Sequence, residues 1–295
     1  MKGIVLAGGK GTRLYPVTTA ICKQLLPVYD KPMIYYPLSV LMQAGIQEVM
    51  IISTPEDLPR FQQMLGNGDR FGLSLSFKAQ PSPDGIAQAF LIAESFIGTD
   101  SVGLILGDNI FYGRDLEKQL LSSAQLAEGG MVFAYQVPDP SRYGVITFDP
   151  QGRALTIVEK PEKPASSYAL TGLYFYDPQV IEIAKSLKPS LRGELEITDV
   201  NNAYLKRGLL QVQTLGSDFF WFDTGTHDAL HHASSFVQNI QGKQGSKVGC
   251  LEEIAYRKGF IGASQLLDAA SQNKTSEYSQ YLLGVYEKSF NGKPV

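Results

Sequence analysis

The segment Ile4-Val5-Leu6-Ala7-Gly8-Gly9-Lys10-Gly11-Thr12-Arg13 joins a short apolar run to a glycine-rich turn. The apolar run predicts a buried β-strand. Glycines placed directly after a strand let the backbone approach an anion closely, and consecutive N–H groups then form a nest for phosphate oxygens. The glycine spacing does not match a P-loop and lacks the third glycine of the dinucleotide fingerprint. On spacing alone, a tight structural turn is an equally good interpretation.

Outward from this junction, strand-length apolar runs alternate with stretches of helical spacing, which is typical of βαβ units in a parallel sheet. The expected strands are residues 4–7, 48–53, 74–80 and 102–106, and the expected helices are residues 35–44, 58–65 and 86–96. Past residue 108, short strands follow one another at residues 131–137, 145–148, 155–159 and 170–176. We expect these to form a second, partly antiparallel portion folded onto the first sheet. Helices are expected at 179–187 and 197–206, strands at 210–215 and 219–222, and mainly helix from residue 227 onward.

The composition excludes several classes of protein. With 295 residues, 44% hydrophobic and 19% charged, the chain can bury a sizeable core and is not a disordered polymer. Its net charge of −3 lacks the basic excess of a nucleic-acid binder. Cys22 and Cys250 are the only cysteines, which argues against a disulfide framework or a thiolate zinc site. No apolar run suits a signal peptide or reaches the roughly 20 residues that span a bilayer, so we expect a cytoplasmic protein without membrane or nucleic-acid partners.

Two aspartates follow apolar strands. Asp108 comes after residues 102–106, and Asp223 ends the run 219–222. Ligands of open α/β sheets bind at the carboxyl ends of strands, and two carboxylates brought to one edge suit Mg²⁺. An Asx turn is the simpler explanation of Asp108 taken alone. Asp223-Thr224-Gly225 also matches the aspartic-protease triplet, but it occurs once and in an α/β context.

Three further segments place polar groups at the ends of predicted elements. Gln80 and Gly85 precede a helix, where an amide can contact a nucleotide base, although a rigid proline-rich turn explains the segment as well. Tyr143-Gly144 and Glu159-Lys160 lie at strand ends, where they suit a polyol phosphate or, more simply, a turn and an exposed ion pair. His227 and His231 have metal-ligand spacing, but no third ligand is evident and a solvated face is the preferred interpretation.

The ordered set of these motifs closely resembles the sugar-nucleotidyltransferase family. The matching segments, which cover nearly the whole chain in order, are Leu6–Pro16, Lys23–Pro37, Gln80–Ala89, Leu106–Gly113, Arg142–Val145, Glu159-Lys160-Pro161, Thr171–Asp177, Arg192–Val200 and Trp221–His227. The resemblance implies an α/β fold: a Rossmann-like, mostly parallel sheet flanked by helices, with a smaller antiparallel sugar-binding portion and a helical C-terminal lobe. It implies a nucleotidyltransferase domain at residues 1–241, divided near residue 110 into nucleotide and sugar halves, and a helical extension at residues 242–295.

The same resemblance implies the substrates dTTP and glucose 1-phosphate, the cofactor Mg²⁺ and direct attack of the sugar phosphate on the nucleotide α-phosphorus. By this similarity, the nucleotide is bound by Gly8, Gly9, Gly11, Thr12, Arg13, Gln80, Gly85 and Asp108. The sugar phosphate is bound by Tyr143, Gly144, Glu159, Lys160, Tyr174 and Trp221. Asp108 and Asp223 hold the metal, while Arg13 and Lys23 stabilise charge on the reacting phosphates.

The resemblance also implies a homo-oligomer, specifically a tetramer. In some relatives a downstream nucleotide sugar, dTDP-rhamnose, inhibits the enzyme at a second site, which the similarity places near Gly113, Glu253 and Arg257. Three alternatives to the main hypothesis stay open here: a non-catalytic nucleotide-sensing subunit, an NAD-dependent oxidoreductase, and an enzyme of the same family that uses UTP or another sugar 1-phosphate. The charged residues Arg13, Lys23, Asp108 and Asp223 favour an enzyme over a sensing subunit.

Overall fold

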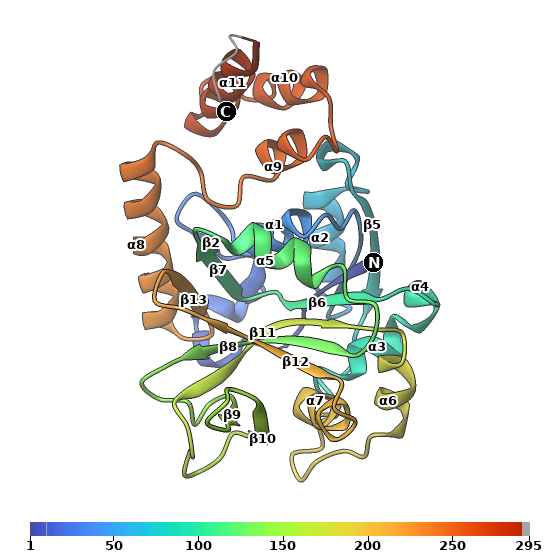
Figure 1. Cartoon of the computed structure of the whole chain (residues 1–295). Coiled ribbons are helices and arrows are strands. Elements are labelled where there is room, and N and C mark those ends of the chain that lie inside the picture. Colours follow the sequence, from blue (N-terminus) through green and yellow to red (C-terminus); the bar gives the residue numbers. More distant parts are fainter. Residues whose placement is uncertain (10, 291–295) are drawn as a thin grey trace.

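Strand β1 (Lys2–Ala7) lies in the middle of a nine-stranded mixed sheet. The computed structural model describes residues 1–9 and 11–290 (Figure 1). Four strands are parallel and follow the predicted βαβ order, namely β1, β4 (Glu48–Ser53), β5 (Ser74–Ala79) and β6 (Val102–Leu106). Residue Leu6 lies opposite Ile52 on one side and Leu106 on the other. The strands therefore end together at one edge of the sheet.

The partly antiparallel portion expected after residue 108 is confirmed, but it continues the same sheet instead of folding onto it. Its strands are β8 (Gly130–Gln136), β9 (Gly144–Phe148), β10 (Ala154–Glu159) and β11 (Tyr168–Tyr176). β11 runs antiparallel to β6, with Leu173 opposite Ile105, and it also pairs with β8 and β9. β12 (Leu210–Leu215) is parallel to β8 at the sheet margin. Eight of the nine residues of β11 are buried, so this strand needs neighbours on both sides.

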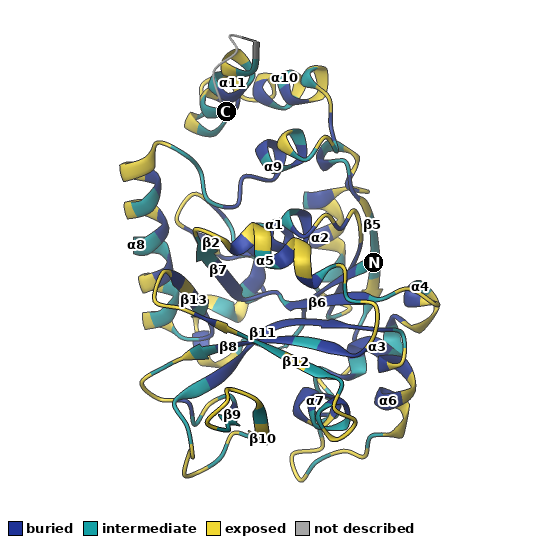
Figure 2. Cartoon of the chain, in the orientation of Figure 1, coloured by how far each residue is buried: buried dark blue, intermediate teal, exposed yellow. Residues whose placement is uncertain are grey.

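Helices cover both faces of the sheet, and alternate strand residues feed two separate cores. Val5, Ile51 and Ile105 pack with α1 (Tyr35–Gln43), α2 (Leu58–Leu65) and α5 (Leu116–Ser123). Ile4, Leu6 and Met50 face the other way, toward α3 (Gln88–Ile92), α4 (Glu94–Ile97), α6 (Val180–Ser186) and α7 (Ile197–Lys206). Figure 2 shows the resulting buried centre between exposed helix surfaces.

Three features differ from the predicted elements. The helix expected at residues 86–96 is divided into α3 and α4, because Ala93 leaves helical geometry at φ −93° and ψ 6°. A two-stranded ribbon of β7 (Asn109–Gly113) and β13 (Phe219–Asp223) lies outside the main sheet, and β7 and α5 were not predicted. Between β1 and α1 the chain forms short 3₁₀ helices at Thr12–Leu14, Val17–Thr19 and Lys23–Leu25, and a small hairpin of β2 (Pro27–Val28) and β3 (Lys31–Pro32). One more 3₁₀ turn lies at Asp69–Phe71.

The last part of the described chain is helical, as predicted. Its helices are α8 (His227–Gln244), α9 (Leu251–Arg257), α10 (Ala263–Ser271) and α11 (Glu277–Phe290). The end of the predicted helical extension, residues 291–295, lies outside the described residues. Thr226 caps α8 by accepting a hydrogen bond from Ala229 N. Leu251 and Ala255 of α9 belong to the same apolar core as α1 and α2. Across residues 1–9 and 11–290, we find no helix with the length and apolar character needed to cross a membrane.

Candidate active site

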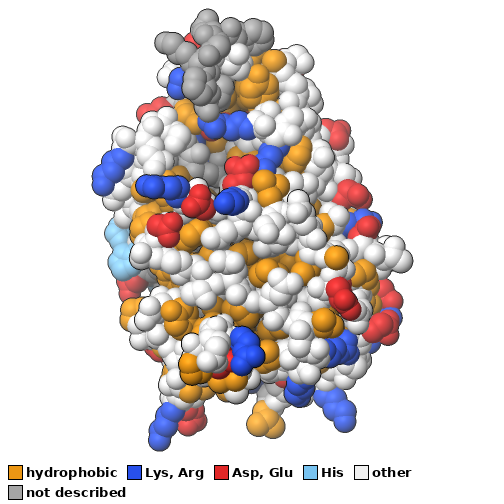
Figure 3. Space-filling view, viewed as in Figure 1, with side chains coloured by type: hydrophobic (Ala, Val, Ile, Leu, Met, Phe, Trp, Pro, Cys, Tyr) orange, Lys and Arg blue, Asp and Glu red, His pale blue; other side chains and the backbone are white. Residues whose placement is uncertain are grey.

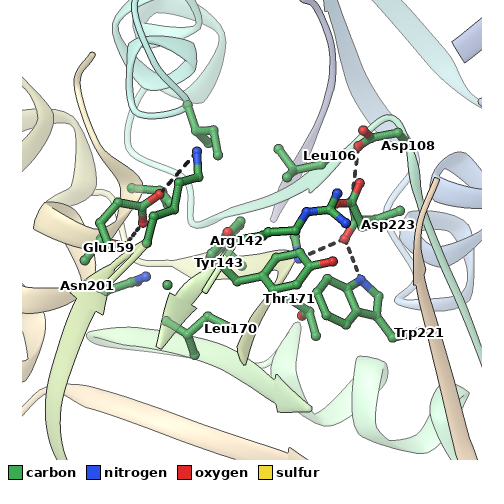
Figure 4. A pocket seen from close by; sticks show the side chains of 18 of the residues that line it. Leu106, Asp108, Arg142, Tyr143, Glu159, Leu170, Thr171, Asn201, Trp221 and Asp223 are labelled. Atoms are coloured by element: carbon green, nitrogen blue, oxygen red, sulfur yellow. Dashed lines mark hydrogen bonds and ion pairs between the residues drawn. The ribbon is translucent and has the colours of Figure 1, made fainter. Parts of the chain in front are cut away.

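The β7–β13 ribbon brings Asp108 and Asp223 together. In the antiparallel register Asp223 lies opposite Asn109, the residue that follows Asp108. Thr224 then closes the ribbon, because its N–H and its hydroxyl both donate to the Asp108 carbonyl oxygen, at 3.1 and 2.7 Å. Figure 4 shows the two carboxylates side by side at one end of a pocket. Two acids that are far apart in the sequence thus lie at the same edge of the sheet.

Basic side chains surround this carboxylate pair. Lys23 Nζ forms an ion pair with Asp108, and Arg142 Nη2 lies 3.7 Å from Asp223 Oδ2. The Arg13 guanidinium packs against Gly225, where an added Cβ would lie 2.6 Å from Arg13 Nη2. Three cations therefore converge on two acids, which suits a site for a polyanion such as a nucleotide.

The two carboxyl groups differ in their proton affinity. Burial by itself raises the pKa of Asp108, but the charge of Lys23 and the hydrogen bonds from Lys23 and Asn109 outweigh burial and hold this pKa below its usual value. Burial and the neighbouring Asp108 charge raise the pKa of Asp223 above its usual value, despite the nearby cations. The site consequently carries an unfavourable negative charge at Asp223, which a bound cation would relieve.

We expect the substitution Asp223→Asn to raise the melting temperature at neutral pH without divalent ions. The folded carboxyl holds its proton more tightly than the unfolded one, so the wild-type protein loses stability as the pH rises through the raised pKa. Asparagine does not ionise, so the variant does not lose this stability. The increase in melting temperature over the wild type should therefore become smaller as the solution is acidified below the raised pKa of Asp223. Thermal unfolding over a pH series measures this difference, and a gain that is independent of pH would contradict the assignment.

Asn109 connects the ribbon to the main sheet, and the sequence analysis did not single it out. Its Oδ1 accepts hydrogen bonds from Trp221 Nε1 at 2.6 Å and from Gly172 N at 3.0 Å. Its Nδ2 donates to Asp108 Oδ1 at 3.1 Å. The side chain is buried and thus holds a carboxylate, an indole and a backbone N–H in fixed positions. Only its place beside Asp108 hinted at a role in the sequence.

The larger cavity next to the carboxylates has a volume of about 590 Å³. Nine residues that were expected to bind substrate or metal line it, namely Arg13, Asp108, Tyr143, Gly144, Glu159, Lys160, Tyr174, Trp221 and Asp223. Other residues that line the cavity include Arg142, Thr171, Ile197 and Thr198, which lie in the matching segments but were given no role, and Asn201, which lies outside these segments. Ile197, Thr198 and Asn201 belong to α7. No local feature of the sequence predicts that these residues of α7 line the cavity.

Glu159 lies at the end of this cavity away from the aspartates (Figure 4). Thr198 Oγ1 donates to Glu159 Oε2 at 2.5 Å, and Arg192 Nη2 lies 3.4 Å from Glu159 Oε1. Lys160 Nζ lies 3.7 Å from the same oxygen and is half exposed at the cavity mouth. Both ends of the cavity therefore combine carboxylates with cations. Carboxylates suit hydroxyl groups and cations suit phosphate, so the lining matches a ligand that carries both.

A second, smaller cavity of about 220 Å³ lies over the end of β1. The predicted nucleotide-binding residues Gly8, Gly9, Gln80, Gly85 and Asp108 line it, together with Lys23, which was predicted to stabilise charge on the reacting phosphates. An added Cβ at Gly8 would lie 2.6 Å from Gln80 Oε1, so a side chain there would displace the Gln80 amide. Gly85 has φ +105° and faces the Leu195 backbone, which also excludes a side chain. Ile86, Leu106 and Asp108 line both cavities, so the two spaces meet at the Asp108 carboxylate.

Gly11 and Thr12 line neither of these two cavities as far as the described residues define them. Gly11 has φ +59° at the start of a 3₁₀ helix and packs against Thr18, which accounts for a glycine there structurally. Their expected contact with phosphate stays a prediction. Lys10 of the same motif lies outside the described residues.

A third cavity, of about 280 Å³, lies between β7 and α9. Gly113, Glu253 and Arg257 all contribute to its lining, and Arg257 Nη2 pairs with Glu253 Oε1 at 2.6 Å. These are the residues expected near a regulatory site, and that role stays a prediction. The face in Figure 3 carries interspersed acidic and basic side chains without a continuous basic area, in keeping with the net charge.

Comparison with known proteins agrees with this arrangement. The nucleotidyl transferase family model matches residues 2–240. A glucose-1-phosphate thymidylyltransferase of Neisseria meningitidis serogroup A is 56% identical over 288 residues, which are 98% of this chain and 100% of that protein. The Mycobacterium tuberculosis protein of the same name is 53% identical over 289 residues, again 98% of this chain and 100% of the relative.

Solved structures share the fold. A crystal structure of a candidate glucose-1-phosphate thymidylyltransferase from Bacillus anthracis, in complex with sucrose, superposes with a TM-score of 0.75 at 45% identity and covers 80% of this chain and 94% of that one. A UDP-glucose pyrophosphorylase complexed with UDP-glucose gives a TM-score of 0.70 at 27% identity and covers 81% of this chain and 98% of that one. The chain therefore belongs to the nucleotidyl transferase family and, within it, to the glucose-1-phosphate thymidylyltransferases.

Proposed function

We propose that this protein forms dTDP-glucose and pyrophosphate from dTTP and glucose 1-phosphate. The observation that carries the proposal is the meeting of the two cavities at Asp108, because one space suits a nucleotide and the other suits a sugar phosphate. A phosphate oxygen of the sugar attacks the α-phosphorus of dTTP. A new P–O bond forms there, the bond from the α-phosphorus to the bridging oxygen breaks, and pyrophosphate leaves with that electron pair.

The reaction needs neither a covalent enzyme intermediate nor a general base. A sugar phosphate is already ionised at neutral pH, so its oxygen is a nucleophile without proton removal. Catalysis then depends on alignment of the two substrates and on stabilisation of charge. Arg13 and Lys23 are the residues that supply positive charge at the junction of the cavities, which agrees with a site that has no histidine-activated nucleophile.

The carboxylate pair fits Mg²⁺. Asp108 and Asp223 are buried oxygen donors side by side, and the raised pKa of Asp223 reflects charge that a cation would neutralise. Within residues 1–9 and 11–290 there is no cluster of three or more His, Cys, Asp or Glu side chains that could hold a metal. In proteins, Mg²⁺ is commonly held by one or two carboxylates together with substrate phosphate and water. Mg²⁺ bound there would polarise the α-phosphate and help to orient the substrates.

The proposed contacts divide the substrates between the two cavities. Gln80 and Gly85 would contact the base, since the Gln80 amide already donates to Gln88 Oε1 at 2.7 Å and is held beside Gly8. Glu159 and the Gly144 backbone would contact sugar hydroxyls, with Tyr143, Tyr174 and Trp221 as the walls. We also propose that the protein forms a homo-oligomer, by similarity a tetramer. We propose that the nucleotide and sugar halves divide near residue 110 and that the nucleotidyltransferase domain ends near residue 241.

Pyrophosphate release tests the proposed reaction. The purified protein is incubated with Mg²⁺ and each pair from a matrix of dTTP, UTP, CTP, GTP and ATP with glucose, galactose and mannose 1-phosphates. We expect the highest kcat/KM for dTTP with glucose 1-phosphate. Preference for UTP would instead favour the UDP-glucose pyrophosphorylase activity named for one structural neighbour. Absence of release with every pair would favour a non-catalytic nucleotide sensor, and stabilisation by NAD would favour the oxidoreductase hypothesis.

We expect Lys160→Ala to weaken the binding of sugar phosphate selectively. Lys160 has φ +41° and places its ammonium at the mouth of the larger cavity, near Glu159 but away from the smaller one. The KM for glucose 1-phosphate should rise about tenfold or more, since a charge-assisted contact is worth about 1.5–3 kcal/mol. The KM for dTTP should hardly change. Equal effects on both KM values would reject a role specific to the sugar phosphate.

A further inference from the structure

Asn201 places an unpartnered amide in the larger cavity. The residue lies on α7 and is completely buried. Its Oδ1 accepts a hydrogen bond of 2.5 Å from the Tyr176 hydroxyl, while its Nδ2 has no partner among the described residues. Figure 4 shows the amide nitrogen directed toward the inside of the cavity, at the end occupied by Glu159. Buried donors without a partner are rare in folded proteins and require an explanation.

The surroundings of Tyr176 fix which end of the amide faces the cavity. The Tyr176 ring is stacked between Tyr174 and Tyr204, with interplanar angles of 9° and 10°. Tyr204 is held in turn by a hydrogen bond of 2.7 Å from its hydroxyl to Asp177 Oδ1. Burial raises the pKa of Tyr176 well above its usual value, so its hydroxyl stays protonated and donates. The amide oxygen is thereby occupied, and the NH₂ group is presented to the cavity.

We propose that Asn201 Nδ2 donates a hydrogen bond to a ring hydroxyl of the hexose and that Asn201 is a specificity-determining residue for the sugar. This inference rests on the proposed function and adds a contact outside the family motifs used above. The location supports a hydroxyl rather than the phosphate, because Asn201 is completely buried, whereas Lys160, the proposed phosphate ligand at this end of the cavity, has a side chain that is 44% exposed. Thr171 Oγ1 is a second buried polar atom of this cavity without a partner among the described residues, which agrees with a hydroxyl-rich ligand.

The single substitution Asn201→Leu would strand the Tyr176 hydroxyl in the core and risks misfolding. The double variant Tyr176→Phe/Asn201→Leu avoids this problem, because replacing both partners by apolar groups of similar shape is nearly neutral for stability. We expect it to melt close to the wild type and to raise the KM for glucose 1-phosphate about tenfold, while the KM for dTTP stays unchanged. Ser76→Ala is a matched control, since it removes another buried, unpartnered polar atom that lines neither cavity.

Deoxy sugars identify the hydroxyl. The kcat/KM values of the wild type and of the double variant are compared for glucose 1-phosphate and its 2-, 3- and 4-deoxy analogues. For the wild type, we expect kcat/KM to be about tenfold lower with one of the analogues than with glucose 1-phosphate. For the double variant, kcat/KM with that analogue should equal kcat/KM with glucose 1-phosphate. If the folded double variant has a wild-type KM, or loses equally on every analogue, Asn201 does not contact the sugar and its amide is only hydrated. Turnover of dTTP and glucose 1-phosphate by the wild type distinguishes failure of the proposed function from failure of the role of Asn201. If the wild type shows no turnover, the proposed function is overturned. If the wild type turns over and the double variant has the same kinetic constants, only the role of Asn201 is overturned.

Discussion

Asp108→Asn and Asp223→Asn should each lower kcat by at least about a hundredfold, because loss of one preorganised charge-stabilising group typically costs about that much. Both substitutions preserve side-chain shape and remove a negative charge that is proposed to hold Mg²⁺ beside the substrate phosphates. The backbone bonds from Thr224 to the Asp108 carbonyl remain, so the fold should be intact. Steady-state pyrophosphate release in Mg²⁺, together with circular dichroism, measures the two effects.

Asp268→Asn is a suitable control for these variants. Asp268 is an exposed residue of α10, far along the chain from both cavities, and the same change of charge there should leave kcat unaltered. Binding of Mn²⁺, followed by paramagnetic resonance, adds a readout that is independent of turnover and should weaken in both active-site variants. Wild-type kcat in Asp108→Asn and Asp223→Asn would refute the metal assignment.

Asn109→Ala should lower the free energy of unfolding by about 3 kcal/mol or more, since it leaves three groups without their hydrogen-bond partner at about 1–3 kcal/mol for each buried one. The stranded groups are the Trp221 indole N–H, the Gly172 N–H and one oxygen of Asp108. Turnover should fall as well, because both a cavity wall and a proposed metal ligand lose their support. Urea unfolding monitored by tryptophan fluorescence is the direct measurement, since Trp221 is the sole tryptophan.

The control for Asn109→Ala is Asn67→Ala. Asn67 is exposed, and its Nδ2 bonds Asp69 Oδ2 at 2.6 Å at the surface. Its loss should cost less than about 1 kcal/mol, because water replaces the partner. If Asn109→Ala cost no more than this control, the connection between ribbon and sheet would not depend on Asn109.

The sequence predicted regular elements well and their junctions less well. β4, α2, β6, α7 and β12 have the expected bounds because each contains its own apolar pattern. β7 was missed because Asn109–Gly113 follows β6 after one short turn and alternates weakly. The division between α3 and α4 depends on packing around Ala93, which no local propensity expresses.

The candidate site was predictable where a residue lies within a recognisable motif. Gly8, Gln80, Asp108, Glu159 and Asp223 were all singled out, and all line one of the two cavities that meet at Asp108. Thr198 lies within the matching segment Arg192–Val200 but was given no role, and Asn201 lies outside every matching segment, since their helix carries an ordinary amphipathic pattern. Their place in the cavity arises from the way α7 packs against the second core.

By itself, the sequence determined the α/β class, the order of strands and helices in the first half, and the identity of the charged groups near glycine-rich turns. These properties are local, because burial periodicity and turn chemistry act over a few residues. Only the tertiary structure decided that β11 continues the parallel sheet, that the β7–β13 register sets Asp223 beside Asp108, and that Tyr176 turns the Asn201 amide into the pocket. Pairings of this kind join distant segments, and their register depends on the packing of the whole chain rather than on any neighbouring residues.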